Sequence, residues 1–233
     1  MKRILVCEDE EAIRDFVVIN LRRAGYDVVD VACGEDAVEV FNKQEGGFDV
    51  ALLDIMMPGM DGFALCRWIR EQSSEIGIIM LSAKSQEMDK VNCLMIGADD
   101  YVTKPFSPSE LVARVDAIYR RVSVSHAHKE VSKNITSGPF TLDYQSRTVR
   151  KNGELVDLTQ VEYHIMEYLL KNRNTALDRK TILRHIWGEA YYGEDKVVDV
   201  NIRRLRMKIE DDPGAPQMLL TVRGMGYKWN VIS

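Results

Sequence analysis

The sequence has no apolar run near 18 residues and no basic, apolar and small-residue pattern at its N-terminus, so it predicts neither a membrane span nor a secretory signal. Its four cysteines all lie far apart in the first half and form no C-x-x-C pair, which favours free thiols over a zinc site or disulfides. Reduced thiols suit the cytosol, so we expect a cytoplasmic protein.

The two halves of the chain differ in charge. Residues 1–121 hold 14 Lys and Arg against 22 Asp and Glu, a net −8, whereas residues 122–233 hold 17 against 14, a net +3. A polar stretch without helical periodicity, 122–137, lies between them and predicts a linker. The 233 residues are therefore expected to form two domains, 1–121 and 138–233. His126 and His128 resemble a ligand pair, but we interpret them as solvated linker residues.

In the first half, short apolar runs alternate with amphipathic segments. The first helical stripe is expected to comprise Ile13, Phe16, Val17 and Leu21. Strands are expected at 3–9, 27–32, 48–54, 76–83 and 100–105, each followed by a helix, the last of them at 108–121. Five strands and five helices in alternation predict an α/β fold with a doubly wound five-stranded parallel sheet. Ligands of such sheets bind at the carboxyl ends of the strands.

Polar residues gather at these strand ends, namely Glu8, Asp9, Asp54, Ser82 and Lys104. Neighbouring carboxylates raise one another's pKa unless a cation lies among them. Hard oxygen ligands in a partly open site favour Mg²⁺. With Mg²⁺ and Lys104 withdrawing negative charge, Asp54 can attack a phosphoryl group in line and form an acyl phosphate.

The residues Glu8-Asp9 with the stretches "DIMMPGMDG" and "GADDYVTKPF" resemble the receiver domain of two-component response regulators, a CheY-like fold of about 120 residues. The resemblance implies that Asp54 is the phosphoacceptor. It implies an Mg²⁺ site made by Asp54, Asp9 and the main-chain carbonyl of Met56, with Glu8 binding through water.

For the switch, the resemblance implies that Ser82 and Lys104 bond the phosphoryl oxygens and that Tyr101 turns inward when Ser82 moves. It also implies a cis peptide between Lys104 and Pro105. Ser82 stands where relatives more often have threonine, but it keeps the hydroxyl.

Two rival functions are less consistent with these residues. A haloacid dehalogenase-type phosphohydrolase also forms an aspartyl phosphate, but it needs a second Asp two positions after the nucleophile, where this chain has Met56. Dinucleotide binding needs G-x-G-x-x-G after the first strand, where "CEDEEA" stands. We therefore expect a phosphoacceptor that holds the phosphoryl group as a signal, and not an enzyme.

The receiver resemblance also implies a homodimer that forms on phosphorylation through the fourth helix, fifth strand and fifth helix. The expected ion pairs across the two-fold join Lys90 with Glu110, Asp100 with Arg114, and Asp99 with Arg121. The expected apolar contacts are Val91, Leu94 and Ala113.

The second half predicts a small antiparallel sheet with a "KNGE" turn, then three helices and a terminal hairpin. The first helix should begin after the N-cap Thr159, with Glu162 three residues on. In the third helix, a core stripe is expected at Val198, Ile202, Leu205 and Ile209. The outward side is expected to carry Lys196, Val200, Arg203, Arg204 and Met207. This basic side suits a DNA major groove, and a solvated surface helix is the alternative.

The order helix, helix, basic helix, hairpin is that of a winged helix-turn-helix. The stretches "VVDVNIRRLRMKI" and "TVRGMGY" resemble the effector domain of the OmpR/PhoB family of response regulators, over roughly residues 138–231. The resemblance implies promoter DNA with tandem half-sites and contact of the 187–195 loop with RNA polymerase. The expected DNA contacts are Lys196, Val200, Asn201, Arg203, Arg204, Arg206, Thr221 and Arg223.

Together these patterns predict a transcriptional response regulator that a sensor histidine kinase phosphorylates on Asp54. A receiver that signals without DNA output, or a standalone phosphatase, are the alternatives.

Overall fold

The computed structural model describes residues 2–44, 47–83, 87–123, 134–189, 191 and 193–231; the side chains of 87–89 and 121–123 are not described. The chain divides into two compact units, Met1–Ser123 and Val124–Ser233. Helix α5 extends to Ser123 and strand β6 begins at Ile135, so both elements reach into the stretch predicted as a linker. His126 and His128 lie outside the described residues. Within the described part of the chain, every helix is too short or too polar to span a membrane.

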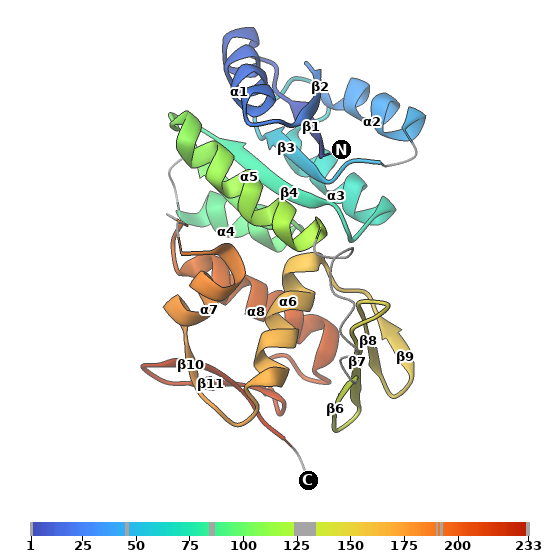
Figure 1. Ribbon diagram of the computed structural model, residues 1–233, viewed down its shortest axis with the longest axis vertical. Helices are drawn as coiled ribbons and strands as arrows, with labels where there is room; N and C mark the ends of the chain where they lie inside the picture. The colour runs from blue at the N-terminus through green and yellow to red at the C-terminus, as the bar shows by residue number, and fades with distance from the viewer. Residues whose placement is uncertain are drawn as a thin grey trace. The chain divides into compact units, whose positions relative to one another are not determined.

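The first unit contains the predicted parallel sheet (Figure 1). Its strands are β1 (Arg3–Cys7), β2 (Asp27–Val31), β3 (Val50–Asp54), β4 (Gly77–Ser82) and β5 (Asp100–Thr103). They pair in the order β2-β1-β3-β4-β5, and every pair is parallel. The strand order reverses between β1 and β3, which is where such sheets bind their ligands.

Helices cover both faces of this sheet (Figure 1). They are α1 (Glu11–Arg23), α2 (Gly34–Lys43), α3 (Gly62–Gln72), α4 (Glu87–Met95) and α5 (Pro108–Ser123). Helices α1 and α5 contact each other, and α2 contacts α3. Strands β3 and β4 are buried along their whole length, as expected for central strands covered on both faces.

The stripe predicted for α1 is partly wrong. Val17 and Leu21 are buried, but Phe16 is 38% exposed and Val18 is buried instead. The Phe16 ring lies beside Phe106, with centroids 6.2 Å apart. Phe16 therefore extends over the segment that follows β5, a contact that helical periodicity alone does not reveal.

In its described residues, the second unit has two sheets and three helices (Figure 1). The antiparallel sheet β6-β7-β8-β9 is formed by β6 (Ile135–Ser137), β7 (Phe140–Asp143), β8 (Thr148–Lys151) and β9 (Glu154–Val156). The helices are α6 (Gln160–Lys171), α7 (Arg179–Trp187) and α8 (Lys196–Ile209). The sheet β10-β12-β11 combines β10 (Leu177–Asp178) with the hairpin of β11 (Leu219–Val222) and β12 (Gly226–Trp229).

Local sequence explains the sharp features of this unit. Asn152 and Gly153 both have positive φ, 53° and 88°, as a two-residue hairpin turn of the predicted "KNGE" type requires. Thr159 and Glu162 form the predicted capping box at the start of α6. The core includes Phe140 and Trp229, whose rings meet edge to face with centroids 5.4 Å apart. The unit thus has its own core beneath α8 and the hairpin.

All four cysteines are free. Cys7, Cys66 and Cys93 are buried and Cys33 is half-buried, in agreement with the interpretation as thiols.

Candidate functional site

Three carboxylates meet at the carboxyl edge of the parallel sheet. Glu8 and Asp9 follow β1 and Asp54 ends β3, and one ligand oxygen from each lies within 4.8 Å of the others. Glu8 is fully buried and Asp54 is 3% exposed, whereas Asp9 is exposed. The structure therefore brings together the three acids that the sequence predicted, at the point where the strand order reverses.

Lys104 supplies a positive charge to this cluster. Its Nζ lies 2.6 Å from Glu8 Oε2 and 2.7 Å from Asp54 Oδ1. Burial alone would lower the pKa of Lys104, but its hydrogen bonds to Asp54 and Glu8 outweigh burial and raise it. The Lys104-Pro105 peptide is cis, as predicted. The ammonium group is thus kept charged between two of the acids.

The cluster still holds more negative than positive charge. Burial raises the pKa of Glu8, and the nearby Asp54 adds to this effect, while Lys104 opposes it. Among the described residues, the buried Oε1 of Glu8 has no hydrogen-bond partner. Three carboxylates around one lysine, with an unpartnered buried oxygen, fit a hard divalent cation such as Mg²⁺.

The segment after Asp54 is folded tightly around the carboxylate. The backbone N–H of Met56 donates to Asp54 Oδ2 at 3.0 Å. Gly62 starts α3 so close to β3 that a Cβ there would lie 2.1 Å from the Asp54 carbonyl oxygen. Asp61 caps α3 by accepting from the Ala64 N–H at 2.7 Å. The glycine in "MPGMDG" at position 62 is therefore needed for this close return of the chain.

Arg14 braces the acidic loop from α1, a role that the sequence did not reveal. Its Nη1 donates to the carbonyl of Glu8 at 2.8 Å and to that of Asp9 at 3.2 Å. Its Nε lies 3.8 Å from Asp30 Oδ2. The only sequence signal is an arginine one helical turn after the acidic loop.

The predicted switch residues lie near the site. Ser82 ends β4 and is 4% exposed, and its carbonyl accepts from the Lys104 N–H at 2.7 Å. Tyr101 is 7% exposed, with Lys90 Nζ 5.2 Å from its ring centroid. Tyr101 is therefore largely buried in this structure, and its predicted turn with Ser82 stays a prediction.

The residues predicted for the dimer interface divide into two groups. Lys90, Val91, Glu110 and Ala113 are half-buried and available at the surface. Leu94 and Asp99 are each 1% exposed in the single chain, and their predicted place in the interface stays a prediction. The Asp99 carboxylate pairs with Arg70 at 2.5 Å and accepts from the Ile78 N–H. The Arg121 side chain lies outside the description.

Arg114 also has partners inside the chain. It is 7% exposed and pairs with Asp100 at 3.1 Å and with Glu110 at 2.9 Å. The acids expected to pair across a two-fold thus share Arg114 within one chain.

In the second unit, the predicted outward face of α8 needs correction. Lys196, Arg203 and Met207 are exposed. Val200, Asn201 and Arg204 are buried, at 7%, 0% and 6% exposure. The stripe of α8 buried against the rest of the unit is therefore wider than the predicted four residues, and these three residues do not face solvent as DNA contacts require.

Two of these buried side chains have polar partners inside the unit. Asn201 Nδ2 donates to the carbonyl of Val197 at 2.8 Å, one turn back in α8. Arg204 pairs with the fully buried Glu162 of α6 at 2.9 Å. Sequence periodicity cannot show that α6 places a carboxylate there.

The hairpin residues lie as predicted at an exposed edge. Thr221 and Arg223 are exposed, and Gly224 next to Arg223 has φ +75°. Arg206 of α8 donates to the Leu219 carbonyl at 2.6 Å and to Thr221 Oγ1 at 2.9 Å. Arg206 therefore ties the hairpin to α8, in addition to any contact with DNA.

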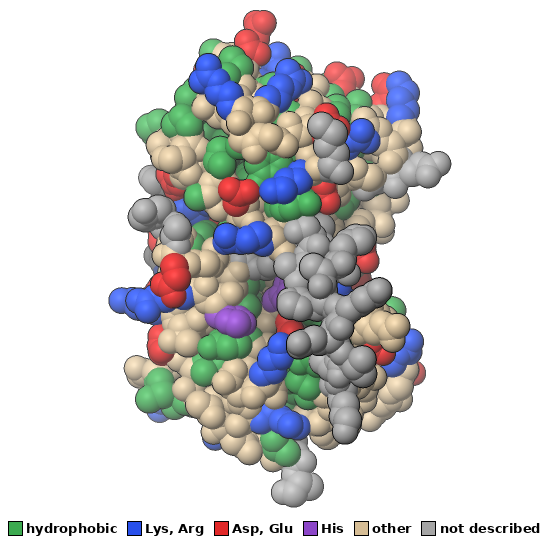
Figure 2. All heavy atoms as spheres, viewed as in Figure 1, with side chains coloured by type: hydrophobic (Ala, Val, Ile, Leu, Met, Phe, Trp, Pro, Cys, Tyr) green, Lys and Arg blue, Asp and Glu red, His purple; other side chains and the backbone are tan. Residues whose placement is uncertain are grey.

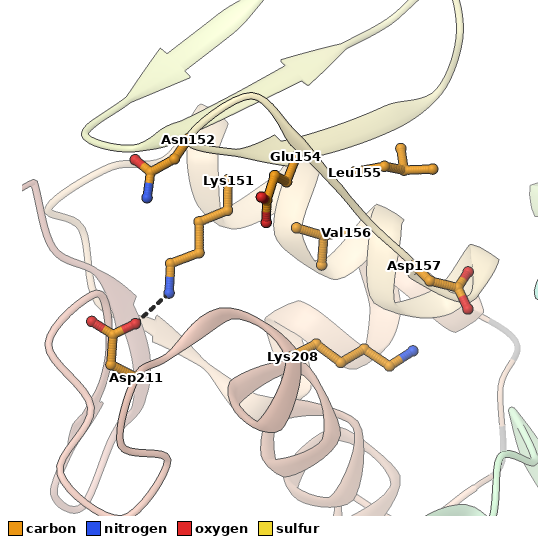
Figure 3. Close-up of a pocket in the computed structure, with 8 residues that line it drawn as sticks. All are labelled: Lys151, Asn152, Glu154, Leu155, Val156, Asp157, Lys208 and Asp211. Atoms are coloured by element: carbon orange, nitrogen blue, oxygen red, sulfur yellow. Dashed lines mark hydrogen bonds and ion pairs between the residues drawn. The ribbon is translucent and has the colours of Figure 1, made fainter.

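A pocket of about 670 Å³ lies between the β8–β9 hairpin and the end of α8 (Figure 3). Both lysines that line it are paired, Lys151 with Asp211 at 2.6 Å and Lys208 with Glu162 at 2.7 Å.

On the face drawn in Figure 2, acidic and basic side chains are interspersed over the first unit. The acid cluster remains the best candidate for chemistry.

Two family models match the chain. The first, described as response regulator receiver domain, matches residues 4–116. The second, described as transcriptional regulatory protein, C terminal, matches residues 153–229.

Solved structures resemble the chain over both units. DrrB of Thermotoga maritima, an OmpR/PhoB homologue, is 33% identical, with 99% of each chain covered and a TM-score of 0.52. A cysteine-to-serine mutant of RitR is 28% identical, with 98% of this chain and 99% of that chain covered and a TM-score of 0.75. The receiver domain of the Francisella response regulator 1452 is 34% identical, covering 53% of this chain and 100% of its own, with a TM-score of 0.50.

Proposed function

Because the chain belongs to the OmpR/PhoB family of two-component transcriptional response regulators, we propose that a sensor histidine kinase phosphorylates it on Asp54 and that the phosphorylated chain dimerises on promoter DNA. The observation that carries this proposal is the position of Asp54. It lies at the switch point of the sheet, with Lys104 on one oxygen and two further acids beside it.

The contacts of Asp54 suit it as a nucleophile. Its Oδ1 is next to Lys104 Nζ and its Oδ2 accepts from the Met56 N–H, so the carboxylate is held in one orientation. In the transfer, an Asp54 oxygen forms a bond to phosphorus while the bond from phosphorus to the kinase imidazole breaks. Lys104 then neutralises a phosphoryl oxygen.

Asp9, Asp54 and the Met56 carbonyl would hold Mg²⁺, with Glu8 bonding a metal-bound water. The bound cation would supply charge neutralisation for the entering phosphoryl oxygens. Arg14 holds the carbonyls of Glu8 and Asp9, so it keeps the loop that carries two of these acids in place.

The acyl phosphate is expected to persist as a signal. A phosphohydrolase of the rival class would carry an acid two residues after Asp54, and here Met56 stands there with its side chain 59% exposed. Slow hydrolysis by solvent is then the route back, and the protein acts as a transcription factor and not as an enzyme.

For the dimer, we propose the interface of α4, β5 and α5, without the pair of Asp99 with Arg121 and without Leu94. Lys90 with Glu110 and Asp100 with Arg114 are the ion pairs we expect, after Arg114 exchanges its partners within the chain for partners across the two-fold. Val91 and Ala113 supply the exposed apolar contact. Asp99 is engaged by Arg70, so we give it no role across the interface.

For DNA, the exposed residues of α8 and the hairpin are the expected contacts. Arg203 would read a base edge in the major groove, with Lys196 on a phosphate. Arg223 at the hairpin tip would enter the adjacent minor groove, with Thr221 on the backbone. Tandem half-sites spaced by about one helical turn, roughly 10 to 11 base pairs, would place two copies on one side of the duplex.

RNA polymerase is the expected partner of the 187–195 loop, in which positions 190 and 192 lie outside the description. Kinase, polymerase and promoter together imply a cytoplasmic protein.

The test combines phosphotransfer with DNA selection. The full chain is first incubated with Mg²⁺ and phosphorylated candidate kinases, and label on Asp54 is measured. The labelled chain is then used to select DNA from a random pool. Recovery of a tandem motif supports the proposal. If the labelled protein enriched no sequence, the alternative of a receiver that signals without binding DNA would be favoured.

The DNA contacts are tested on the selected site and on scrambled DNA. Arg203→Ala should lose about 1 to 3 kcal/mol on the selected site and relax the preference at particular positions. Lys196→Ala should weaken binding to the selected site and to scrambled DNA alike, and it should reduce the salt slope of binding by about one. If neither variant differed from the parent, the winged helix would not be the DNA reader.

A further inference from the structure

Glu162 is a fully buried carboxylate at the start of α6. The Thr159 side chain accepts from the Glu162 N–H, and the Thr159 N–H donates to Glu162 Oε2 at 2.9 Å. This capping box is local in sequence, so it orients the carboxylate independently of its contacts with α8.

Two cations of α8 meet this one carboxylate. Arg204 Nη2 lies 2.9 Å from Oε1, and Lys208 Nζ lies 2.7 Å from Oε2. Figure 3 shows Lys208 leaving α8 and extending along the pocket beneath the β8–β9 hairpin. Because the two residues are four positions apart, they lie one turn apart on the same side of α8. Two attachment points on one side fix both the rotation of α8 and its position along its axis.

The rotation of α8 decides which arginine is presented to DNA. Arg203 is exposed and Arg204 is 6% exposed, although adjacent helical residues differ by only about 100° in direction. The Arg204 guanidinium also lies 3.5 Å from Asn201 Oδ1, within the same buried face. A release of Arg204 would bring a second, competing arginine within reach of the duplex.

We infer that Glu162 is a positioning residue of the DNA-reading helix: through Arg204 and Lys208 it sets the rotation of α8, so that Arg203 reads bases and Arg204 is kept from the phosphates. This inference rests on the proposed DNA-binding function. It gives the buried carboxylate a role beyond helix capping, and it assigns different roles to two adjacent arginines.

A pure capping role makes a different prediction. Glu162→Gln keeps an oxygen for the Thr159 N–H and nearly the same volume, but it removes the charge that holds the two cations. A cap alone would then change stability only. A positioning role would also change the selectivity for DNA sequence.

The first experiment compares the full-length parent with Glu162→Gln on the selected site and on scrambled DNA, over a range of salt. Asp211→Asn is the matched control, because it removes one negative charge from an exposed residue of the same unit. We expect Glu162→Gln to bind scrambled DNA more tightly, with a salt slope steeper by about one, and to lose roughly tenfold in selectivity. Asp211→Asn should keep the parent's selectivity.

The second experiment makes one chemical change at two adjacent positions, and it decides the matter even where Glu162→Gln does not fold. Arg204→Lys keeps a cation for Glu162, so selectivity and salt slope should match the parent. Arg203→Lys loses the bidentate geometry of arginine and should lose roughly tenfold in selectivity.

Two results would overturn the inference. One is a Glu162→Gln protein that folds and keeps the parent's selectivity and salt slope, which would make Glu162 a cap only. The other is an Arg204→Lys protein that loses selectivity as Arg203→Lys does, which would make Arg204 a direct reader. If the parent itself preferred no sequence, the proposed DNA-binding function would fail, and the inference with it.

Discussion

The two units of the chain each bury a small ionic cluster, and the clusters have opposite compositions. In the first unit, one lysine, Lys104, forms ion pairs with Glu8 and Asp54, and Asp9 lies close by. In the second unit, one carboxylate, that of Glu162, forms ion pairs with Arg204 and Lys208. The first cluster has an excess of acids and an unpartnered oxygen on Glu8, which fits the proposed binding of a cation and a phosphoryl group. The second has an ion pair on each oxygen of Glu162, and these ion pairs join α6 to α8.

The pKa shifts follow the same division. Burial raises the pKa of Glu8, and Lys104 only partly opposes this. Burial would also raise the pKa of Glu162, but Arg204 and Lys208 outweigh it and lower the pKa. Glu8, beside two further acids and one lysine, therefore has a raised pKa at the proposed phosphorylation site, whereas Glu162, with two cations of its own, has a lowered pKa at a contact between helices.

The largest expected effect comes from removing Glu162, the carboxylate of the second cluster. Glu162→Ala leaves Arg204 and Lys208 without their anion and removes the cap, so the second unit should lose about 3 to 5 kcal/mol of unfolding free energy. Urea unfolding followed by fluorescence measures this in a Trp68→Phe background, where the remaining tryptophans, Trp187 and Trp229, both belong to the second unit. Asp211→Asn, at a carboxylate 97% exposed, should cost almost nothing. A loss equal to that of Asp211→Asn would remove Glu162 from this account.

The next largest effect is the stabilisation of the first unit when Mg²⁺ binds to the cluster of Glu8, Asp9 and Asp54. Mg²⁺ at about 100 times its Kd should raise the unfolding free energy of the first unit by about 2.7 kcal/mol. Scanning calorimetry in Mg²⁺ and in EDTA measures the shift, and the transition of the second unit serves as the internal control. Glu8→Gln should reduce the response to Mg²⁺. An equal response of both units to Mg²⁺ would contradict the contrast between the clusters.

Acid should weaken the second unit through its paired carboxylates. Burial would raise the pKa of Glu167, but hydrogen bonds with His164 and Lys171 lower it from 4.5 to about 2. A depressed pKa contributes stability above pH 4.5 that is lost as the pH falls toward 2, a loss on the order of 1 to 3 kcal/mol. Urea unfolding at several pH values should show a shallower dependence for Glu167→Gln than for Glu154→Gln at an exposed carboxylate. Equal slopes would contradict the assignment.

The smallest effect concerns the dimer. Surface ion pairs contribute about 0 to 1 kcal/mol each, so Glu110→Gln should weaken the phosphorylated dimer only slightly. Arg114→Glu places a third acid beside the buried Asp100 and beside Glu110, so it should weaken the dimer more and also destabilise the first unit. Sedimentation of the phosphorylated variants measures both. A dimer that tolerated Arg114→Glu unchanged would place the interface elsewhere.

The sequence predicted the features that depend on local pattern. Alternating strands and helices placed Asp54 and Glu8 at one edge, and the spacing of Thr159 and Glu162 predicted the capping box that the structure contains. These signals are short-range, or they follow from the rule that parallel strands end at one edge.

Features that depend on long-range packing could not be predicted in the same way. Helical periodicity placed Arg204 on an outward face, because it does not show that a carboxylate of α6, 42 residues earlier, lies against that face. Asp99 was expected at a dimer interface, but Arg70 of α3 reaches it within the chain. In both cases the partner is distant in sequence, and only the packing of two helices or of a helix and a loop brings it close.

The most direct test of the central claim, that Asp54 is the phosphoacceptor, is labelling by a small phosphodonor. The full chain is incubated with labelled acetyl phosphate in Mg²⁺, beside Asp54→Asn and the matched control Asp61→Asn, and the product is treated with hydroxylamine. We expect the parent and Asp61→Asn to carry label that depends on Mg²⁺ and is released by hydroxylamine, as an acyl phosphate is, and Asp54→Asn to carry none. Hydroxylamine-sensitive label that persists on Asp54→Asn would contradict the account.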